Sequence, residues 1–387
     1  MQKQIGTLRR RVTRLVLPSA LAAFGLAAGA FLGTSGCGAA MGARSKGTRL
    51  ERMQASPQYR DGEFPNPEPT SVMKASTWQM TRAWLRGAEQ REPREPVPTL
   101  ATDPRLFESP PPSGLRVTWL GHSTTLIEIE GRRFLTDPVF GKRASPSTLA
   151  GPARFFAPPL PLERLPEVDA VLISHDHYDH LDYRTLLALA KTRARFVVPL
   201  GVGAHLERWG VIRDRIDELD WWERVRIAGV ELVAAPTRHF SGRGVADRNS
   251  TLWTSWALLG SERRVYFGGD SGPGKGFAEI GERLGPFDLT MLEIGASDPM
   301  WPLIHLGPAA ALEAHQALRG RVLLPIHWAT FNLALHAWFE PGEELAAGAA
   351  KAGARVAFPR PGESFEPTGA IPEAKWWSPA SEVEAAR

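Results

Sequence analysis

The sequence SHDHYDH, residues 174–180, places three histidines and two aspartates directly after the apolar run AVLI, residues 170–173. Four consecutive apolar residues are typical of a strand that is covered on both faces. Imidazole and carboxylate groups without sulfur suit zinc, iron or manganese as metal ligands. The alternative is a polar loop of solvated histidines, but three histidines at this spacing favour a metal site. The spacing is HxHxDH, and it comprises His175, His177, Asp179 and His180.

Length and composition indicate a globular chain. Its 387 residues can bury a sizeable core in one large domain or two small ones. The hydrophobic content of 43% and the charged content of 23% are those of a folded rather than a disordered protein. Cys37 is the single cysteine, which excludes an intramolecular disulfide and a multi-cysteine zinc site. Any metal is therefore expected to be held by His, Asp or Glu.

Residues 1–36 have the pattern of an export signal. Basic residues come first, an uncharged stretch from Leu15 to Gly33 follows, and the small residues of TSGCG lead to Cys37. A cysteine after small residues resembles the lipobox of bacterial lipoproteins, which predicts that Cys37 is lipidated. The alternatives are an uncleaved anchor, a cleaved signal or, least favoured, a cytosolic chain. We expect an exported protein, anchored to a membrane through its N-terminus and facing the periplasm or the exterior.

The positive charge of the chain is concentrated in this leader. It holds five basic and no acidic residues, which exceeds the formal net charge of +4 of the whole chain. The body is therefore close to neutral and slightly acidic. Its composition gives no support for nucleic-acid binding.

Hydrophobic patterns divide the chain into an extended N-terminal region over residues 37–112, a domain of strands and helices over 113–370 and a C-terminal tail over 371–387. The N-terminal region is rich in Pro, Arg and Glu, with one amphipathic helix expected within 71–87. In the domain, strands dominate early and alternate with helices later, which predicts a layered α/β protein with mixed sheets. Strands are expected within 115–121, 124–131, 132–138, 170–173, 194–201, 225–236, 255–270 and 321–328, and helices within 181–192, 202–210 and 308–320.

The HxHxDH spacing at a strand end resembles the metallo-β-lactamase fold superfamily. This resemblance implies a four-layer αβ/βα sandwich, here with an N-terminal extension, and further ligands at later strand ends. His239 in AAPTRHFSGR, Asp270 in VYFGGDSG and His327 in LLPIHWATF follow in the order that the family requires.

The resemblance also implies two divalent metal ions, with Zn²⁺ the expected metal. A water molecule between the metals would be the nucleophile. The first metal would be held by His175, His177 and His239, and the second by Asp179, His180 and His327. Asp270 would bridge both metals and serve as a catalytic residue.

Several longer segments are similar to N-acyl-phosphatidylethanolamine-hydrolysing phospholipase D and its bacterial relatives. They include WLGHSTTLIEIEG, ISHDHYDHLDYRTL, FGGDSGPGKGFAEIGERLGPFDL and PIHWATFNLAL, and the resemblance covers residues 57–365. That family cleaves the phosphodiester on the head-group side of the phosphate, releasing N-acylethanolamine and phosphatidic acid. A phospholipid or another ester is therefore the expected substrate, and a homodimer is possible because family members can be dimers.

Three further residues match family positions near the metals. His305 in WPLIHLGP is expected to orient the phosphate or to protonate the leaving alkoxide. His122 in WLGHSTT is expected beside the ligands rather than among them, and Asp137 in LTDPVF either orients a ligand histidine or caps a turn. The remaining histidines are expected at the surface or in packing roles; they are His205, His315 and His336.

Two other functions remain open from the sequence. The same scaffold could hydrolyse another ester, a lactone or a different phosphodiester, because fold does not fix substrate. A non-catalytic surface lipoprotein is the second alternative, which the full set of seven expected ligands disfavours. The tryptophan pairs, Trp221–Trp222 and Trp376–Trp377, are expected in packing roles more than at a membrane.

Overall fold

The computed structural model describes residues 37–378 apart from 87–89. The predicted leader, residues 1–36, lies outside the described residues, as do residues 379–387 of the predicted tail. Cys37 is the first described residue and begins helix α2. Within the described part of the chain, every helix is too short or too polar to cross a bilayer.

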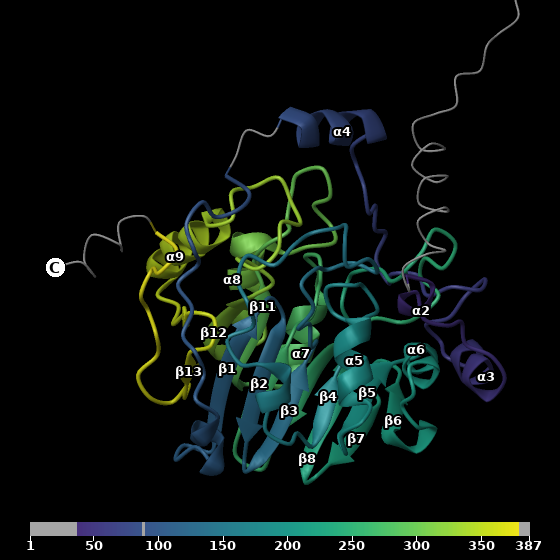
Figure 1. The fold of residues 1–387 in the computed structure, drawn as a ribbon, viewed down its shortest axis with the longest axis horizontal. Helices are drawn as coiled ribbons and strands as arrows, with labels where there is room; N and C mark the ends of the chain where they lie inside the picture. Colours follow the sequence, from purple (N-terminus) through teal and green to yellow (C-terminus); the bar gives the residue numbers. More distant parts are fainter. Residues whose placement is uncertain (1–36, 87–89, 379–387) are drawn as a thin grey trace, which may run out of the picture.

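Two sheets form the centre of the molecule (Figure 1). The first sheet has the strand order β13-β1-β2-β3-β4-β5-β6, and the second has the order β12-β11-β10-β9-β8-β7. The strands of the first sheet are β1 (Leu115–Gly121), β2 (Thr124–Ile129), β3 (Arg132–Thr136), β4 (Ala170–Leu172), β5 (Arg195–Pro199), β6 (Ile216–Leu219) and β13 (Ser364–Phe365). Those of the second are β7 (Arg224–Ile227), β8 (Val230–Ala235), β9 (Ser255–Leu259), β10 (Arg264–Phe267), β11 (Phe287–Glu293) and β12 (Gly320–Ile326).

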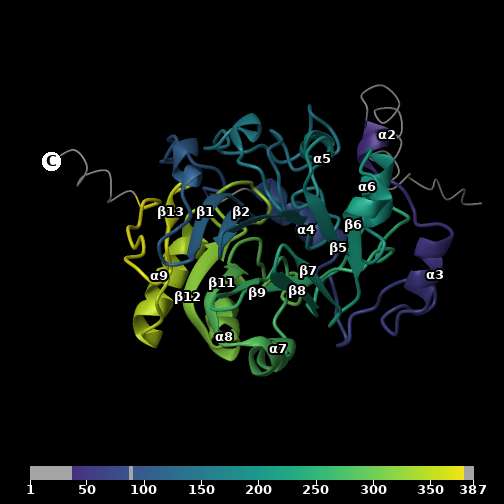
Figure 2. The same ribbon diagram turned by 90° about the horizontal axis from the view of Figure 1, so that it is seen from below.

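Helices cover the outer face of each sheet, as Figure 2 shows. On the first sheet these are α5 (Tyr183–Leu189) and α6 (Gly203–Arg208). On the second they are α7 (Gly276–Leu284), α8 (Gly307–Ala317) and α9 (Glu340–Ala352). The order helix, sheet, sheet, helix confirms the predicted αβ/βα sandwich.

The apolar run before SHDHYDH is explained by this layering. Ala170 and Leu172 of β4 lie in the core between the two sheets. Val171 and Ile173 point the other way, into the layer that contains Leu186 of α5. A strand with apolar neighbours on both faces has no position for a polar side chain, so polarity begins where the strand ends.

The N-terminal region contains more helix than expected. It forms α2 (Cys37–Ala40), α3 (Thr48–Gln54), α4 (Thr77–Arg86) and the 3₁₀ helix η1 (Pro104–Glu108). Of these, only α4 corresponds to a predicted helix. Arg49 of α3 is buried against the body, where its guanidinium group pairs with Glu207 and Glu218. The region therefore lies on the sandwich, while the predicted domain boundaries at 37, 113 and 371 remain predictions.

The tryptophan pairs have mainly packing roles. Trp221, Trp376 and Trp377 are buried, and Trp222 is half-buried against the apolar clusters. The rings of Trp376 and Trp377 also pack on that of Trp328, with centroids 5.3 and 5.0 Å away. Trp328 directly follows His327, so this aromatic cluster stabilises the chain beside a predicted metal ligand.

Glu130 joins the two sheets through a cluster of hydrogen bonds. We expect the free energy of unfolding to decrease at acid pH, when this carboxylate becomes protonated. Its carboxylate accepts hydrogen bonds from the backbone N–H groups of Ser261, Glu262 and Arg263, at 2.8, 2.7 and 2.9 Å. Burial raises the pKa of Glu130, but these bonds outweigh it and lower the pKa to about 2 from an ordinary value of 4.5. The stabilisation is therefore complete above pH 4.5 and is lost as the pH falls towards 2.

Replacement of Glu130 by glutamine should lower the free energy of unfolding by about 1 kcal/mol at pH 7. The difference from wild type should shrink as the pH falls towards 2. Urea unfolding at pH 7 and at pH 3 measures both values. An equal difference at the two pH values would show that the ionised carboxylate is not the source of the stabilisation.

Candidate metal centre

The predicted ligands meet because parallel strands of both sheets end at one edge of the sandwich. In the first sheet, β1 and β4 run in the same direction, and His122 and His175 follow their ends. In the second sheet, β8, β10, β11 and β12 share a direction, and His239, Asp270 and His327 follow three of these strands. Residues far apart in sequence are thereby brought to one buried site.

Three histidines form the first group of the site, His175, His177 and His239. Nδ1 of His177 lies 2.8 Å from Nε2 of His175 and 3.3 Å from Nε2 of His239. Ring nitrogens this close, in a buried position, form a set that suits one cation. The structure thus groups the three residues that the sequence assigns to the first metal.

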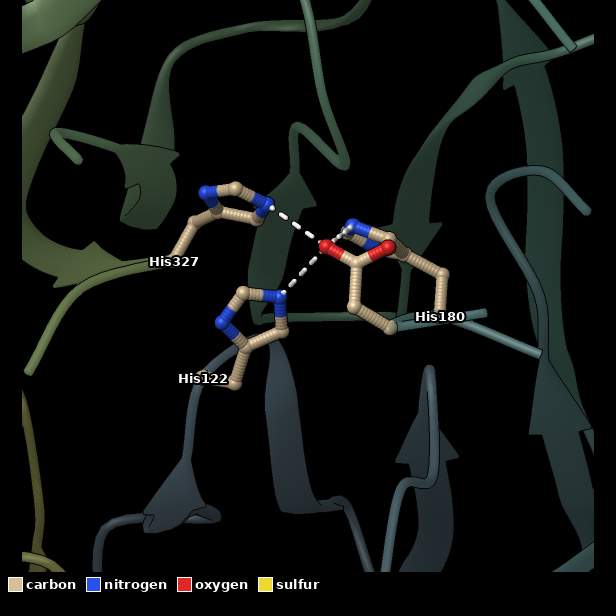
Figure 3. Close-up of side chains that lie close together, drawn as sticks. His122, His180 and His327 are labelled. Carbon is tan, nitrogen blue, oxygen red and sulfur yellow. Dashed lines mark hydrogen bonds and ion pairs between the residues drawn. The ribbon is translucent and has the colours of Figure 1, made fainter. Parts of the chain in front are cut away.

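Asp179, His180 and His327 form the second group. Oδ2 of Asp179 lies 3.4 Å from Nε2 of His180 and 3.3 Å from Nε2 of His327. His122 Nε2 lies 3.1 Å from the same oxygen. Figure 3 shows the three imidazoles directed towards this one carboxylate.

Asp270 lies between the two groups. Its Oδ2 is 3.6 Å from Nε2 of His239 and 3.2 Å from Nε2 of His327. Its Oδ1 is 3.3 Å from Nε2 of His180. A single carboxylate therefore faces histidines of both groups, which is the position that a bridging ligand requires.

Asp137 controls which ring nitrogens of the ligand histidines carry protons. Its Oδ2 accepts hydrogen bonds from Nδ1 of His180 and from Oγ of Ser174, at 2.7 and 2.6 Å. Because the Ser174 hydroxyl donates to Asp137, it accepts from Nδ1 of His175, 2.9 Å away. Both histidines therefore carry the Nδ1 proton and keep the Nε2 lone pair for the site. Of the two roles left open by the sequence, Asp137 has the geometry of the one that orients a ligand.

His239 and His122 are oriented by other contacts. Nδ1 of His239 donates to the carbonyl of Ile304 at 2.8 Å, so its Nε2 also faces the site as an acceptor. Burial lowers the pKa of His122 to about 3. The neutral ring donates from Nε2 to Asp179, which places His122 as a partner of a ligand, as the sequence suggests.

Glu293 is a buried acid that the sequence analysis did not identify. Its Oε2 accepts a hydrogen bond from Nδ1 of His305 at 2.6 Å, and its Oε1 accepts from the backbone N–H of Ser271 at 2.7 Å. Asp270, His327, His305 and Glu293 lie close enough to form a further group. The available signal was a charged residue that ends the apolar strand FDLTMLE, residues 287–293.

Charge is distributed unequally across the site. Burial, followed by the neighbouring imidazole of His180, holds the pKa of His175 well below its ordinary value. Burial also lowers the pKa of His327, but Asp270 and Asp179 outweigh it and raise the pKa to about 10. Burial raises the pKa of Asp270, yet His180 and His327 outweigh it and hold the pKa well below the ordinary range. Asp270 is thus ionised, and positive charge beside it stabilises it.

The donor set fits metal ions. The buried atoms His180 Nε2 and Asp270 Oδ1 face the site and have no hydrogen-bond partner among the described residues. A buried polar atom without a partner costs free energy, so such atoms mark places where another ligand belongs. Nitrogen and carboxylate donors without sulfur suit Zn²⁺ and also iron or manganese.

The backbone is strained at three of these positions. His122, Asp137 and His327 have φ angles of 53°, 32° and 60°, in a region that side-chain-bearing residues rarely adopt. Their surroundings compensate for this strain: the backbone N–H of His122 donates to Thr330, and that of His327 donates to the carbonyl of His122. Such strain is typical of positions where a fixed side-chain direction is needed.

Asp176 and Tyr178 alternate with the ligands and brace their loop. Asp176 accepts hydrogen bonds from the backbone N–H of Gly242 and the hydroxyl of Thr251, at 2.7 and 3.1 Å. The Tyr178 hydroxyl donates to the carbonyl of Arg243 at 2.6 Å. The two side chains therefore tie the HxHxDH loop to the segment that follows His239.

Arg243 extends this brace to the N-terminal segment. Its buried guanidinium group lies 4.1 Å from the ring centre of Tyr178 and donates to the carbonyls of Asp176 and Leu181. Its Nε and Nη2 also donate to the carbonyl of Ala40, at 3.0 and 2.8 Å. One side chain thus connects α2 with both ends of the metal-binding loop.

The remaining histidines lie apart from the two groups. His205 is buried, accepts a hydrogen bond from the backbone N–H of Ala43 and lies 3.4 Å from Asp176. His315 is buried and lies 2.7 Å from the hydroxyl of Thr290. His336 accepts from the backbone N–H of Ala296 at 3.0 Å. These contacts agree with packing roles.

The fold and this site define a class, metal-dependent hydrolases built on two facing sheets. A family model described as "Beta-lactamase superfamily domain" matches residues 132–328. The chain belongs to this family and is a metal-dependent hydrolase of the metallo-β-lactamase fold.

Two proteins are similar to this chain in sequence, and one solved structure is similar to it in fold. An uncharacterised protein of Mycobacterium tuberculosis is 46% identical over 375 residues, which cover 95% of this chain and 99% of the relative. N-acyl-phosphatidylethanolamine-hydrolysing phospholipase D 1 of Caenorhabditis elegans is 39% identical over 246 residues, covering 60% of this chain and 69% of that enzyme. The metallo-hydrolase Igni18 of Ignicoccus hospitalis has a TM-score of 0.50 at 23% identity, covering 65% of this chain and 98% of Igni18, and supports the fold alone.

Proposed function

We propose that this hydrolase is a phospholipase D-type phosphodiesterase that acts on N-acyl-phosphatidylethanolamine-like lipids. The observation that carries the proposal is Asp270, a buried carboxylate that faces both histidine groups in a chain similar to an enzyme of that name. In the proposed reaction, water adds to phosphorus and the bond from phosphorus to the head-group oxygen breaks. The products are N-acylethanolamine and phosphatidic acid.

The side chains of the site would hold two divalent metal ions, with Zn²⁺ proposed. His175, His177 and His239 would hold one ion, Asp179, His180 and His327 would hold the other, and Asp270 would contact both. Bound metal ions would lower the pKa of a water molecule and stabilise the negative charge that develops on the phosphate. Asp137 and Ser174 would keep the ring nitrogens of His180 and His175 unprotonated on the metal side.

His305 is the proposed residue for contact with the substrate. Glu293 accepts a hydrogen bond from its Nδ1, which fixes the ring and leaves Nε2 for a substrate oxygen. The residue also lines a cavity of about 760 Å³, together with Ser297, Asp298 and Glu344. When Nε2 also carries a proton, His305 would donate a hydrogen bond to the phosphate or give that proton to the leaving head-group oxygen and become neutral.

We also propose that the protein is exported and anchored to the membrane through lipidated Cys37. The support is the sequence pattern of residues 1–36 and the position of Cys37 directly before the body. Mass spectrometry of the protein from its native membrane would show an N-terminus at Cys37 with an added lipid mass. An unmodified Cys37 within an intact leader would overturn this proposal.

A substrate panel tests the proposed activity. The metal-loaded protein should release N-acylethanolamine and phosphatidic acid, detected by mass spectrometry, from vesicles that contain N-acyl-phosphatidylethanolamine. It should be much less active on a lactone and on a β-lactam. Turnover of a lactone without any phosphodiester hydrolysis would assign the site to another ester, and no turnover in a sample with two metals per chain would favour a binding protein.

A further inference from the structure

Helix α4 is an exposed amphipathic helix that stands away from the two sheets (Figure 1). Four of the nine exposed large apolar side chains of the described residues lie within residues 73–85, and among them Trp78 and Leu85 are exposed to 67% and 81%. They lie seven positions apart and therefore share one face of the helix. An exposed apolar face of this kind marks a surface that another phase or molecule covers.

The opposite side of the helix attaches it next to the metal centre. Met80 and Val72 pack on a small apolar cluster that contains Trp301 and Ile304. Ile304 precedes His305, and its carbonyl accepts the hydrogen bond from His239. The backbone N–H of Lys74 donates to the carbonyl of Met300 at 2.7 Å, which fixes the start of this segment. The helix is therefore attached to the segment that borders the site, with its exposed face turned away from that segment.

Charge indicates what covers the exposed face. Within Thr77–Arg86 both charged residues are arginines, and Lys74 precedes them. The guanidinium group of Arg82 lies 5.2 Å from the ring centre of Trp78, so cation and apolar surface are presented together. Apolar side chains that include tryptophan, combined with arginines, are typical of helices that lie in the interface of an anionic membrane.

We propose that α4 docks on an anionic lipid surface, inserting Trp78 and Leu85 among the lipids and placing Arg82 and Arg86 against the head groups. This inference rests on the proposed phospholipid substrate, and it assigns the delivery of that substrate to α4. A phospholipid taken from such a surface would enter next to His305 and His239 without leaving the membrane completely. Docking is separate from any anchor at Cys37, because it involves another part of the chain.

Hydrogen exchange of the full chain tests docking without requiring turnover. Backbone amides of residues 77–86 should exchange more slowly when phosphatidylcholine vesicles that contain phosphatidylglycerol are added, and much less so with phosphatidylcholine alone. The double variant Trp78→Ser, Leu85→Ser should lose this protection. Protection that requires only a higher protein concentration would instead assign the face to self-association and overturn the proposal.

Kinetics provide the second measurement. The double variant should lower kcat/KM on vesicle-bound N-acyl-phosphatidylethanolamine by at least about tenfold, and leave hydrolysis of the soluble diester bis(p-nitrophenyl) phosphate unchanged. Ile212→Ser removes an apolar side chain of similar exposure, 62%, and serves as the matched control. This variant should have the kcat/KM of the wild type on both substrates. Arg82→Gln combined with Arg86→Gln should abolish the preference for anionic vesicles.

The two proposals fail in distinguishable ways. Vesicle-dependent protection of α4 without phospholipid hydrolysis would leave docking in place and overturn the proposed substrate. Phospholipid hydrolysis that is equal in wild type and in the double variant, without protection of α4, would overturn docking and leave the substrate in place.

Discussion

Replacement of Asp270 by asparagine is expected to lower kcat/KM for phosphodiester hydrolysis by about a thousandfold or more. Asp270 is the carboxylate that faces His180, His239 and His327 together, so the amide removes a negative charge shared by both groups. Loss of several kcal/mol of charge stabilisation in a two-metal site corresponds to a rate effect of about this size. The metal content, measured by mass spectrometry after dialysis, should fall at the same time.

A half-buried aspartate outside the site provides the control for this experiment. Asp217 pairs with Arg195 between β5 and β6 at 2.8 Å, away from the site. Asp217→Asn should retain the activity and metal content of the wild type. Wild-type turnover in the Asp270 variant would contradict a site in which this carboxylate contacts both metals.

Replacement of Asp137 by asparagine should weaken metal binding by about 10- to 100-fold in each of the two groups. The wild-type carboxylate accepts from His180 directly and from His175 through Ser174. Asparagine has one acceptor oxygen, so it cannot accept from His180 and the Ser174 hydroxyl on one side and from the backbone N–H of Ser174 on the other. Where the amide nitrogen faces His180 and Ser174, the rings would move their protons to Nε2 and lose the lone pairs that face the site. Metal titration by calorimetry measures the affinities, and the fold should be retained.

The outcome separates two roles for Asp137. If it only capped the turn before Pro138, metal affinity would equal that of wild type while the free energy of unfolding fell. If it sets the protonation of the histidines, affinity falls in both groups, although Asp137 touches no residue of the first group directly. The Asp217→Asn variant again serves as the control with unchanged affinity.

The sequence predicted the strands better than the helices. Strands β1, β2 and β4 were expected at nearly their observed positions because apolar runs and turn residues delimit them. Helices α3, α7 and α9 were not expected. For α9 a signal was present in EPGEEL, because Pro341 and the acids Glu340 and Glu343 lie in the first turn, where they favour a helix. Leu345 and Ala349 then bury one side of the helix in the central apolar cluster.

The candidate ligands could be predicted because a family pattern fixed their order and their positions at strand ends. Their hydrogen-bond partners could not be predicted in the same way. The role of Glu293 depends on the pairing of β11 with β12, which places its carboxylate beside His305 and close to His327. This pairing is a tertiary feature that the sequence does not show. Arg243 was not predicted because its side chain binds backbone carbonyl groups. Every residue has a backbone carbonyl group, so no sequence pattern identifies these partners.

The contact between Arg243 and Ala40 has a consequence for the order in which the molecule assembles. The two residues are 203 positions apart, and the segment around Ala40 leaves the ribosome long before its partner. Contacts between such distant positions form late in folding because loop closure must come first. The HxHxDH loop is therefore expected to gain its final rigidity only after the chain beyond residue 243 is available.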